Sequence, residues 1–414
     1  MKIQNHSLKK VVYHCSFLIL FWWTISALGE SNQQNTVTLE ELCSYALTNN
    51  PEVLALQNSV KAKEQDVKLA TALPDPTLSA GYFISEVETR VGPQKGKIGV
   101  SQMIPWPGKL QSKKSIARNE LSAETELLND KKITILLEII DVYATLYAIG
   151  QSIHINRENL ILLKQTESIL FSKYTTTKTS QMSLLKMQVE MSVLDDEIKS
   201  LEAEAKKKRE ILISLLGGSF NDSLSFPQIL PEFEVLIDES IVDSLLNMSN
   251  PILKNIASIQ SATIEKISLS KKEYIPNLML MSDYIFTDES NSSMVTAQEN
   301  GKNPWIIAAS INVPLWFNSK NARISKMRNM SAMVSQKQKN TQNILHAKII
   351  DLNESYTDVD RKIRLFETVL IPKAKQSLVL SEEAYSNSKA SVLDFLHAQR
   401  MLLSLEIKLY KQKA

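Results

Sequence analysis

The chain has 414 residues, of which 43% are hydrophobic and 22% are charged, a composition that fits a folded protein of two or three domains. Its 10 glycines are too few for a loop-rich fold. A formal net charge of +2 supplies no strongly basic surface for a polyanion, so we expect no nucleic-acid partner.

Residues 1–29 have the organisation of a secretory signal peptide. Three lysines precede an apolar run over 11–25, and small residues follow at 27–29. The run is shorter than the ~20 residues of a membrane-spanning helix. Cys15 leaves with this segment, so Cys43 has no partner for an internal disulfide. No later segment has the pattern of a transmembrane helix, and we expect the exported chain to enter a membrane only as a β-barrel.

A short helix comes first in the remaining chain, and a set of longer elements follows it. Thr38 and Glu41 have the spacing of a capping box, in which each side chain bonds the other residue's backbone N–H. Gly217 and Gly218 are expected to end the last helix of the set. The expected elements are a helix over 51–72, strands over 77–85 and 97–104, and helices over 109–172 and 180–216.

The second half of the chain gives the same order of elements again. A proline-punctuated connector over 219–236 separates the two halves. The expected elements are a helix over 251–273, strands over 277–286 and 305–313, and helices over 318–385 and 391–413.

Matching residues indicate two copies of one unit. Asn50-Pro51 recurs as Asn250-Pro251, and Pro76 recurs as Pro276, each 200 residues later. The segment "SQMIP" (101–105) recurs as "SINVP" (310–314), 209 residues later. We therefore predict two repeats, residues 30–218 and residues 237–414.

The predicted strands alternate between apolar and polar residues. Leu78, Ala80, Tyr82 and Ile84 share one face of the first strand, and Trp305, Ile307, Ala309, Ile311 and Val313 share one face of the last. Strands of about 9–11 residues with this period are typical of membrane β-barrels. A soluble, half-buried sheet has the same alternation, so alternation alone leaves both interpretations open.

Four strands are too few to close a barrel, since about eight is the smallest number that does so. An open edge in lipid leaves unpaired amides and carbonyls, each of which costs several kcal/mol. A membrane sheet built from this chain therefore requires several copies of it. The helix over 109–172 would extend about 96 Å, so it must pack lengthwise against neighbouring helices.

The stretch "MIPWPGKL" (103–110) is a corner between a strand and the long helix. Pro105 and Pro107 stop strand pairing, and Gly108 lets the chain turn. Tryptophan is enriched where a membrane meets water. We expect three membrane-interface anchors: Trp106, Trp305, and Trp316 in the equivalent corner "VPLWFNSK" (313–320).

Four motifs resemble those of the TolC-type outer membrane efflux proteins, over nearly the whole mature chain. They are "LPDPTLSAGY" (73–82), "SQMIPWPGKL" (101–110), "LIPKAKQSLVLSEEAYSNSK" (370–389) and "SVLDFLHAQ" (391–399). "LPDP" with "PWPGKL" is most similar to the heavy-metal efflux branch. The resemblance implies a mainly α fold with a membrane β-barrel: a homotrimer whose chains each give four strands to one twelve-stranded barrel, continuous with a long periplasmic α-helical barrel.

The same resemblance implies a location in the cell outer membrane, with outer membrane lipid around the barrel. It also implies two protein partners, a periplasmic adaptor (membrane fusion) protein and an inner-membrane efflux pump. The implied function is a passive exit duct, here for metal cations or small toxicants. A duct for type I protein secretion and a non-pore periplasmic coiled-coil scaffold remain the alternatives.

The resemblance also implies roles for particular residues. Tyr174, Lys178, Tyr385 and Lys389 fall at the periplasmic tip, where adaptors dock. The family has glycine three residues after the tyrosine, whereas this chain has Thr177 and Ser388, so its tip turns depart from the pattern. Asp394 aligns with an acidic position that lines the closed aperture, and His397 falls where another aspartate often stands. The alternative for Asp394 is a solvated acid beside core residues.

Catalysis finds no support in the sequence. The histidines His154, His346 and His397 are far apart, and no zinc-protease, phosphate-loop or nucleophile-elbow motif is present. We predict that the protein is not an enzyme and needs neither a cofactor nor a metal.

Overall fold

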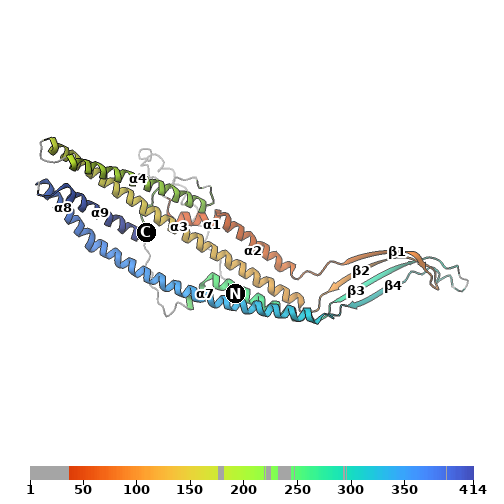
Figure 1. The fold of residues 1–414 in the computed structure, drawn as a ribbon. Helices are drawn as coiled ribbons and strands as arrows, with labels where there is room; N and C mark the ends of the chain where they lie inside the picture. Colours follow the sequence, from red (N-terminus) through yellow and green to blue (C-terminus); the bar gives the residue numbers. More distant parts are fainter. Residues whose placement is uncertain are drawn as a thin grey trace, which may run out of the picture.

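The computed structural model describes residues 37–175, 181–218, 220, 225–231, 244–246, 248–291, 294, 296–387 and 389–414. The predicted signal peptide, and much of the predicted connector over 219–236, lie outside these residues. The described chain is elongated, with a β-sheet at one end and two helical hairpins at the other (Figure 1).

Two short helices begin the described chain, and both start at the caps that the sequence predicts. In α1 (Leu39–Asn49) the capping box is confirmed, because Thr38 N donates to Glu41 at 2.8 Å and Glu41 N donates to Thr38 Oγ1 at 3.3 Å. In α2 (Pro51–Leu69) the Asn50 side chain accepts the N–H groups of Glu52 and Val53. The Asn50 amide also donates to the Leu215 carbonyl at 2.8 Å, which ties this corner to a distant helix.

The sheet has four antiparallel strands in the order β1-β2-β3-β4. They are β1 (Thr77–Val87), β2 (Gln94–Ile104), β3 (Leu278–Thr287) and β4 (Trp305–Ile311). All four predicted strands are confirmed, with ends shifted by at most three residues. The predicted end of the last strand at residue 313 is wrong by two residues, because β4 ends at Ile311. Pro314, three residues further on, has no backbone N–H for pairing.

Long helices make up the rest of the molecule. They are α3 (Lys109–Thr175), α4 (Gln181–Leu215), α6 (Pro251–Lys272), α7 (Phe317–Leu365), α8 (Ile371–Ser386) and α9 (Val392–Lys413). The 67 residues of α3 span about 100 Å, and this helix contacts α2, α4, α6 and α9 along its length. Each pair of strands thus leads into a helix that extends away from the sheet.

Two helix ends confirm the predicted glycine turns. Lys109 N donates to the Trp106 carbonyl at 3.1 Å and Gly108 has a φ of 86°, so Pro107 and Gly108 form the centre of a type II turn. At the end of α4, Gly218 N donates to the Ile213 carbonyl and Gly217 N to the Ser214 carbonyl, the pair of bonds of a Schellman motif.

One predicted helix, residues 318–385, is interrupted. A π-helical turn over Phe366–Leu370 separates α7 from α8. Pro372 gives the physical reason, because its ring lacks an N–H and would clash with the carbonyl four residues earlier in a regular α-helix. The wider turn removes that clash while the helix continues.

By length and composition, α3 contains one stretch apolar enough to cross a membrane, so the expectation that no later segment would do so is wrong. Packing within the chain explains part of the apolar composition, since 39% of that stretch is buried. Ile135, Ile139 and Val142 are buried in a core that α3 shares with α1, α2 and α4. These residues therefore serve the interior of the helical bundle.

Candidate functional site

The four strands give the sheet one continuous apolar face. The register pairs Leu78, Val100, Ser282 and Ile307 across all four strands, and Ala80, Ile98, Tyr284 and Trp305 in the next row but one. Rows nearer the helices add Leu280 with Ala309, and Ile104 with Leu278 and Ile311. Residues directly opposite one another share a face, so these rows form one surface. The predicted period-2 pattern is confirmed on every strand.

Two polar residues interrupt the apolar face, and each has a local partner. The Trp305 indole N–H donates to Ser282 Oγ at 2.6 Å. The Gln102 side-chain amide donates to the Pro74 carbonyl at 2.7 Å. Their hydrogen bonds explain how polar side chains fit an otherwise apolar surface.

The opposite face carries small and polar residues mixed with apolar ones, which are Met103, Met279, Met281, Ile285 and Ile306. Ser79, Gly99 and Asp283 are opposite one another, and Ser101 is opposite Met281. A side chain at position 99 would place its Cβ 2.0 Å from Asp283 Oδ1, so glycine there leaves room for the carboxylate. The two faces therefore differ in chemistry, as the inner and outer walls of a channel do.

Both outer strands of the sheet have an uncovered edge. Residues 71–82 lead into β1 and include its first half, and all of them are exposed. Leu78 has 81% of its surface exposed. On β4, Ile307 has 76% exposed. An exposed, apolar edge strand is a template for pairing with another chain.

The three predicted interface anchors lie at two levels of the sheet. Trp106 and Trp316 follow the ends of β2 and β4 that meet the helices, and Trp305 begins β4 at the other end. All three side chains are exposed. Tyr284 and Phe286, in edge-to-face contact at 5.3 Å between ring centroids, add aromatic surface at the level of Trp305. The exposed apolar rows lie between these two levels.

A buried lysine, which the sequence analysis did not single out, fixes the junction between sheet and helices. The Lys109 ammonium donates to the Ile275 carbonyl at 2.5 Å and to Asn277 Oδ1 at 2.7 Å. Burial lowers the pKa of Lys109, with a further contribution from the nearby ammonium of Lys320. Its place in "PWPGKL" was visible in the sequence, but its contacts depend on the second half of the chain.

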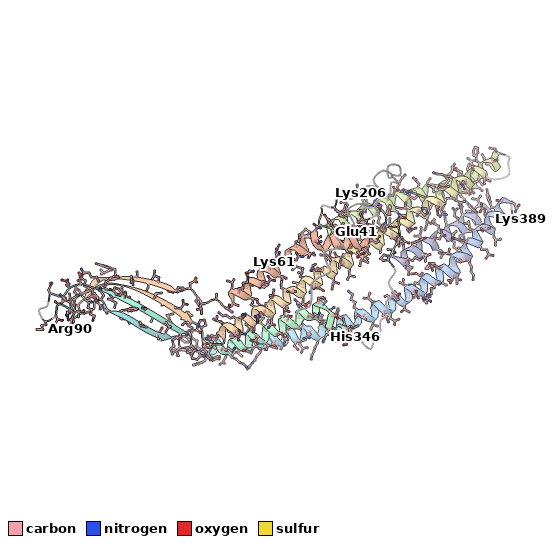
Figure 2. The ribbon with its side chains drawn as sticks, turned by 180° about the vertical axis from the view of Figure 1, so that it is seen from behind. Glu41, Lys61, Arg90, Lys206, His346 and Lys389 are labelled. Atoms are coloured by element: carbon pink, nitrogen blue, oxygen red, sulfur yellow. The ribbon has the colours of Figure 1, made fainter. Side chains whose placement is uncertain are left out.

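The opposite end of the molecule is formed by two helical hairpins, α3–α4 and α8–α9, whose tips lie at the same end (Figures 1 and 2). A shared core joins the hairpins, with Leu163, Leu170, Met187, Tyr385 and Phe395 among its buried members. The Tyr385 ring stacks on Phe395, with the ring centroids 6.2 Å apart. Tyr385 is thus buried inside the tip and does not present its ring at the surface.

The other predicted docking residues are placed differently. Tyr174 is exposed near the end of α3, and Lys389 is exposed just after α8. Lys178, together with Thr177 and Ser388, lies outside the described residues. The structure therefore brings Tyr174 and Lys389 to the same end of the molecule without testing their roles.

Asp394 has a local structural role that the sequence analysis missed. It occupies the third position of α9 in a capping box with Ser391, accepting Ser391 N at 2.9 Å and Ser391 Oγ at 2.8 Å. These hydrogen bonds, with a smaller effect of His397, lower the pKa of Asp394. Both Asp394 and His397 are exposed in the single chain. The S-x-x-D spacing of a cap was present in the motif "SVLDF".

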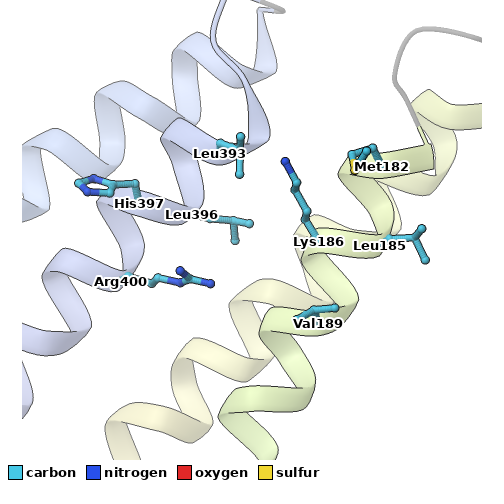
Figure 3. Close-up of a pocket in the computed structure, with 8 residues that line it drawn as sticks. All are labelled: Met182, Leu185, Lys186, Val189, Leu393, Leu396, His397 and Arg400. Carbon is cyan, nitrogen blue, oxygen red and sulfur yellow. The ribbon is translucent and has the colours of Figure 1, made fainter.

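Next to the cap, α4 and α9 enclose a cavity of about 480 Å³. Leu396 and Arg400 extend from α9 towards α4, while His397 lines the cavity with its ring turned away from α4 (Figure 3). Arg400 forms two hydrogen bonds with Glu190 of α4, one of them from Nε at 2.7 Å. The Glu190 side chain is only 6% exposed, so this ion pair is a partly buried tie between the two hairpins.

Within the described residues, no group of three or more histidine, cysteine, aspartate or glutamate side chains is arranged to hold a metal ion. The features that the structure does show are surfaces: an apolar sheet face, a more polar sheet face, two open sheet edges and a helical tip (Figure 1).

Comparison with known proteins gives one sequence relative and several similar folds. No family model matches the chain. It is 20% identical over 399 residues to nodulation protein T of Rhizobium leguminosarum bv. trifolii, covering 93% of this chain and 82% of the relative.

Two solved structures illustrate the likeness of fold. The outer membrane protein VceC of Vibrio cholerae superimposes with a TM-score of 0.73 at 15% identity, covering 91% of this chain and 92% of that one. The CmeC outer membrane channel of Campylobacter jejuni gives a TM-score of 0.69 at 14% identity, covering 91% and 82%. The chain has the fold of the TolC-type outer membrane channels.

Proposed function

We propose that the protein is an outer membrane exit duct that passively conducts substrates out of the cell. The observation that carries the proposal is the open four-stranded sheet, apolar on one face and more polar on the other, at the end of the helix α3, which is about 100 Å long. An apolar face of this extent suits lipid, and a polar face suits a water-filled lumen. The fold shared with CmeC, which is an outer membrane channel, supports the same function.

The single chain cannot form the duct alone, because β1 and β4 leave both sheet edges unpaired. Unpaired backbone groups in lipid cost several kcal/mol each, so closure by further copies is strongly favoured. We propose a homotrimer with a twelve-stranded barrel, in which the two halves of each chain act as equivalent repeats, 30–218 and 237–414. The aromatic residues at the two sheet levels then anchor the barrel at the two membrane surfaces.

The long helices extend the lumen into the periplasm, and the tip formed by α3–α4 and α8–α9 is the proposed contact for a periplasmic adaptor and, through it, an inner-membrane pump. Tyr174 and Lys389, both exposed, are the proposed docking residues there, and Lys178, which lies outside the described residues, is proposed with them. The "LPDP" and "PWPGKL" motifs favour metal cations or small toxicants as substrates, which the pump selects.

Asp394 and His397 are the proposed aperture residues. Three copies of Asp394 around a trimer axis would repel one another and attract divalent cations. An aspartate carboxylate is charged at neutral pH, and the hydrogen bonds from Ser391 that lower the pKa of Asp394 favour the same charged form. The capping role described above is compatible with this proposal, since the carboxylate remains exposed while it caps α9.

Reconstitution tests the proposed function directly. The purified protein should sediment as a trimer in mild detergent and should conduct ions across a planar bilayer at defined single-channel levels. A monomer that conducts would contradict the trimer, and a folded trimer that neither conducts nor stays in carbonate-washed membranes would contradict the duct. In cells, deletion should increase sensitivity to a transition metal or a cationic toxicant, and loss of export of one large protein alone would favour protein secretion.

A further inference from the structure

The start of α7 holds a pocket with excess positive charge. This cavity of about 410 Å³ is lined by charged side chains of three cations and one acid, which are Lys109, Lys320, Arg323 and Glu273. Arg323 is already paired with Glu273, with Nη1 2.7 and 2.8 Å from the two carboxylate oxygens. Lys109 donates to two neutral acceptors, and within the described residues no acid forms an ion pair with Lys320. The pocket therefore favours an additional carboxylate.

An exposed carboxylate lies on the other edge of the same sheet. Asp75 belongs to the "LPDP" segment that leads into β1, and residues 71–80 are all exposed. Within one chain, β1 and β4 are separated by β2 and β3, so their backbones lie about 14 Å apart. Asp75 can reach the pocket at the end of β4 only from another copy of the chain.

The chain already contains a template for this contact. Where β2 ends and β3 begins, Ile104 is opposite Leu278, and Lys109 at the start of α3 bonds the Ile275 carbonyl. The matching residues of the two halves are 209 apart at the strand ends and 200 apart at the strand starts, as in 101–105 with 310–314 and Pro76 with Pro276. Applied to the template, these offsets put Val313 opposite residue 78 of a second copy.

We propose that β4 pairs with β1 of the neighbouring copy in this register, with Ser310 opposite Gly81, and that Asp75 of the neighbouring copy binds beside Lys320. The proposal rests on the proposed trimeric duct and adds its register and a charged contact. In the template, Ile275 lies against the first residue of α3, and the residue that corresponds to Ile275 is Asp75. Its carboxylate thereby meets the start of α7, where Lys320 lines the pocket.

The faces of the strands agree with this register. It places Ile311 opposite Ala80 and Ala309 opposite Tyr82, so the apolar face continues from one copy to the next. A slip by one residue would set the apolar face of β4 against the polar face of β1. Continuity of the two faces therefore excludes slips by an odd number of residues, and the offsets between the two halves select this register among those that remain.

Disulfide cross-linking tests the register. In a Cys43→Ser background, the pair Gly81→Cys and Ser310→Cys should cross-link chains into covalent trimers on oxidation. Within one chain the same pair is too far apart, because a disulfide needs Cα atoms within about 7 Å. A Cβ at position 81 meets only Lys97 side-chain atoms at 3.7 and 3.9 Å, so cysteine fits there.

The matched control is Ser79→Cys with Ser310→Cys, which is offset by two residues, or about 7 Å along the strand. It should give several-fold less cross-linked product. Equal or greater cross-linking of the control pair would overturn the register.

Charge exchange tests the contact. Asp75→Lys should raise the rate of trimer dissociation in detergent about fivefold, the effect of losing one partly exposed ion pair. Asp75→Lys combined with Lys320→Glu should restore the rate to within about twofold, while Glu88→Lys, an exposed acid beyond the far end of β1, should have no effect. Failure of Lys320→Glu to restore the trimer would overturn the contact.

The two levels of inference fail in different ways. A protein that is monomeric and gives no intermolecular cross-link with either cysteine pair would contradict the proposed trimeric duct. A conducting trimer that cross-links through the offset pair, or ignores the charge exchange, would contradict only the register and the Asp75 contact.

Discussion

Replacing Arg400 by methionine should weaken the contact between the α3–α4 and α8–α9 hairpins, because it removes the ion pair between Arg400 and Glu190. The substitution keeps a long side chain against Leu396 and Val189, but it leaves the buried Glu190 carboxylate without its cation. A hydrogen bond to a charged group contributes about 1.5–3 kcal/mol. Because the Arg400 side chain is itself 63% exposed, solvent screens the pair, and we expect a loss of about 2 kcal/mol in the free energy of local opening.

Hydrogen exchange measures this local free energy. A loss of about 2 kcal/mol corresponds to about 30-fold faster exchange of the α9 amides that open with the tip. Arg361→Met is the matched control, because the Arg361 side chain is also 63% exposed and its partner Asp358 is exposed on the same helix. An exposed pair of this kind contributes less than about 0.5 kcal/mol, which corresponds to about twofold.

A double variant identifies the cause. If the stranded carboxylate is responsible, Glu190→Gln in the Arg400→Met background should recover at least about fivefold of the lost protection, since a neutral amide is cheaper to bury. The reasoning is refuted if Arg400→Met exchanges no faster than Arg361→Met, or if Glu190→Gln gives no recovery.

Three further outcomes follow from residues at the tip and at one helix end. Asp394→Asn should weaken block by divalent cations applied from the periplasmic side, whereas Ser391→Ala, which removes the same cap but keeps the carboxylate, should leave block intact; equal currents in both variants would exclude the aperture role. Because the pKa of Asp394 is lowered in the folded chain, its contribution to the α9 cap is present above its ordinary pKa and is lost as pH falls through the lowered value. Amide exchange at the start of α9, corrected for intrinsic rates, should therefore be constant from pH 5 to 8 and rise below about pH 4. Gly217→Ala should destabilise the α1–α2 corner by more than about 1 kcal/mol in thermal unfolding, since Gly217 has a φ of 99° and an added Cβ would lie 2.7 Å from the Asn49 carbonyl oxygen; an unchanged melting temperature would contradict this.

Features with a local cause were predictable from the sequence. The caps at Thr38 and Asn50, the type II turn at Gly108 and the Schellman motif at Gly217 each depend on residues within a few positions of one another. The alternation of apolar and polar residues along the strands was equally predictable, because successive side chains of a strand point to opposite faces of the sheet. The helix starts followed from the same signals, and most element ends agree to within three residues.

Features with a long-range or competing cause were not predictable in the same way. The Glu190–Arg400 pair joins residues 210 positions apart, and nothing in either helix alone indicates that Glu190 is buried. Tyr385 was expected at the docking surface, but its ring packs on Phe395, where an aromatic side chain gains more from burial than from exposure. The π-helical turn over Phe366–Leu370 was not predicted, because the spacing of apolar residues over 318–385 indicates a helix without showing one extra residue in a turn.

That π-helical turn has a consequence for the far end of the molecule. One extra residue in a helical turn advances every later side chain by about 100° around the helix axis. The number of residues over Phe366–Leu370 therefore sets the direction in which Ala374 and Tyr385 of α8 point towards the core. Deleting one residue there would leave every side chain of the tip in place in the sequence but would turn the buried face of α8 towards water. The orientation of the tip therefore depends on the number of residues before Pro372 as well as on which side chains α8 carries.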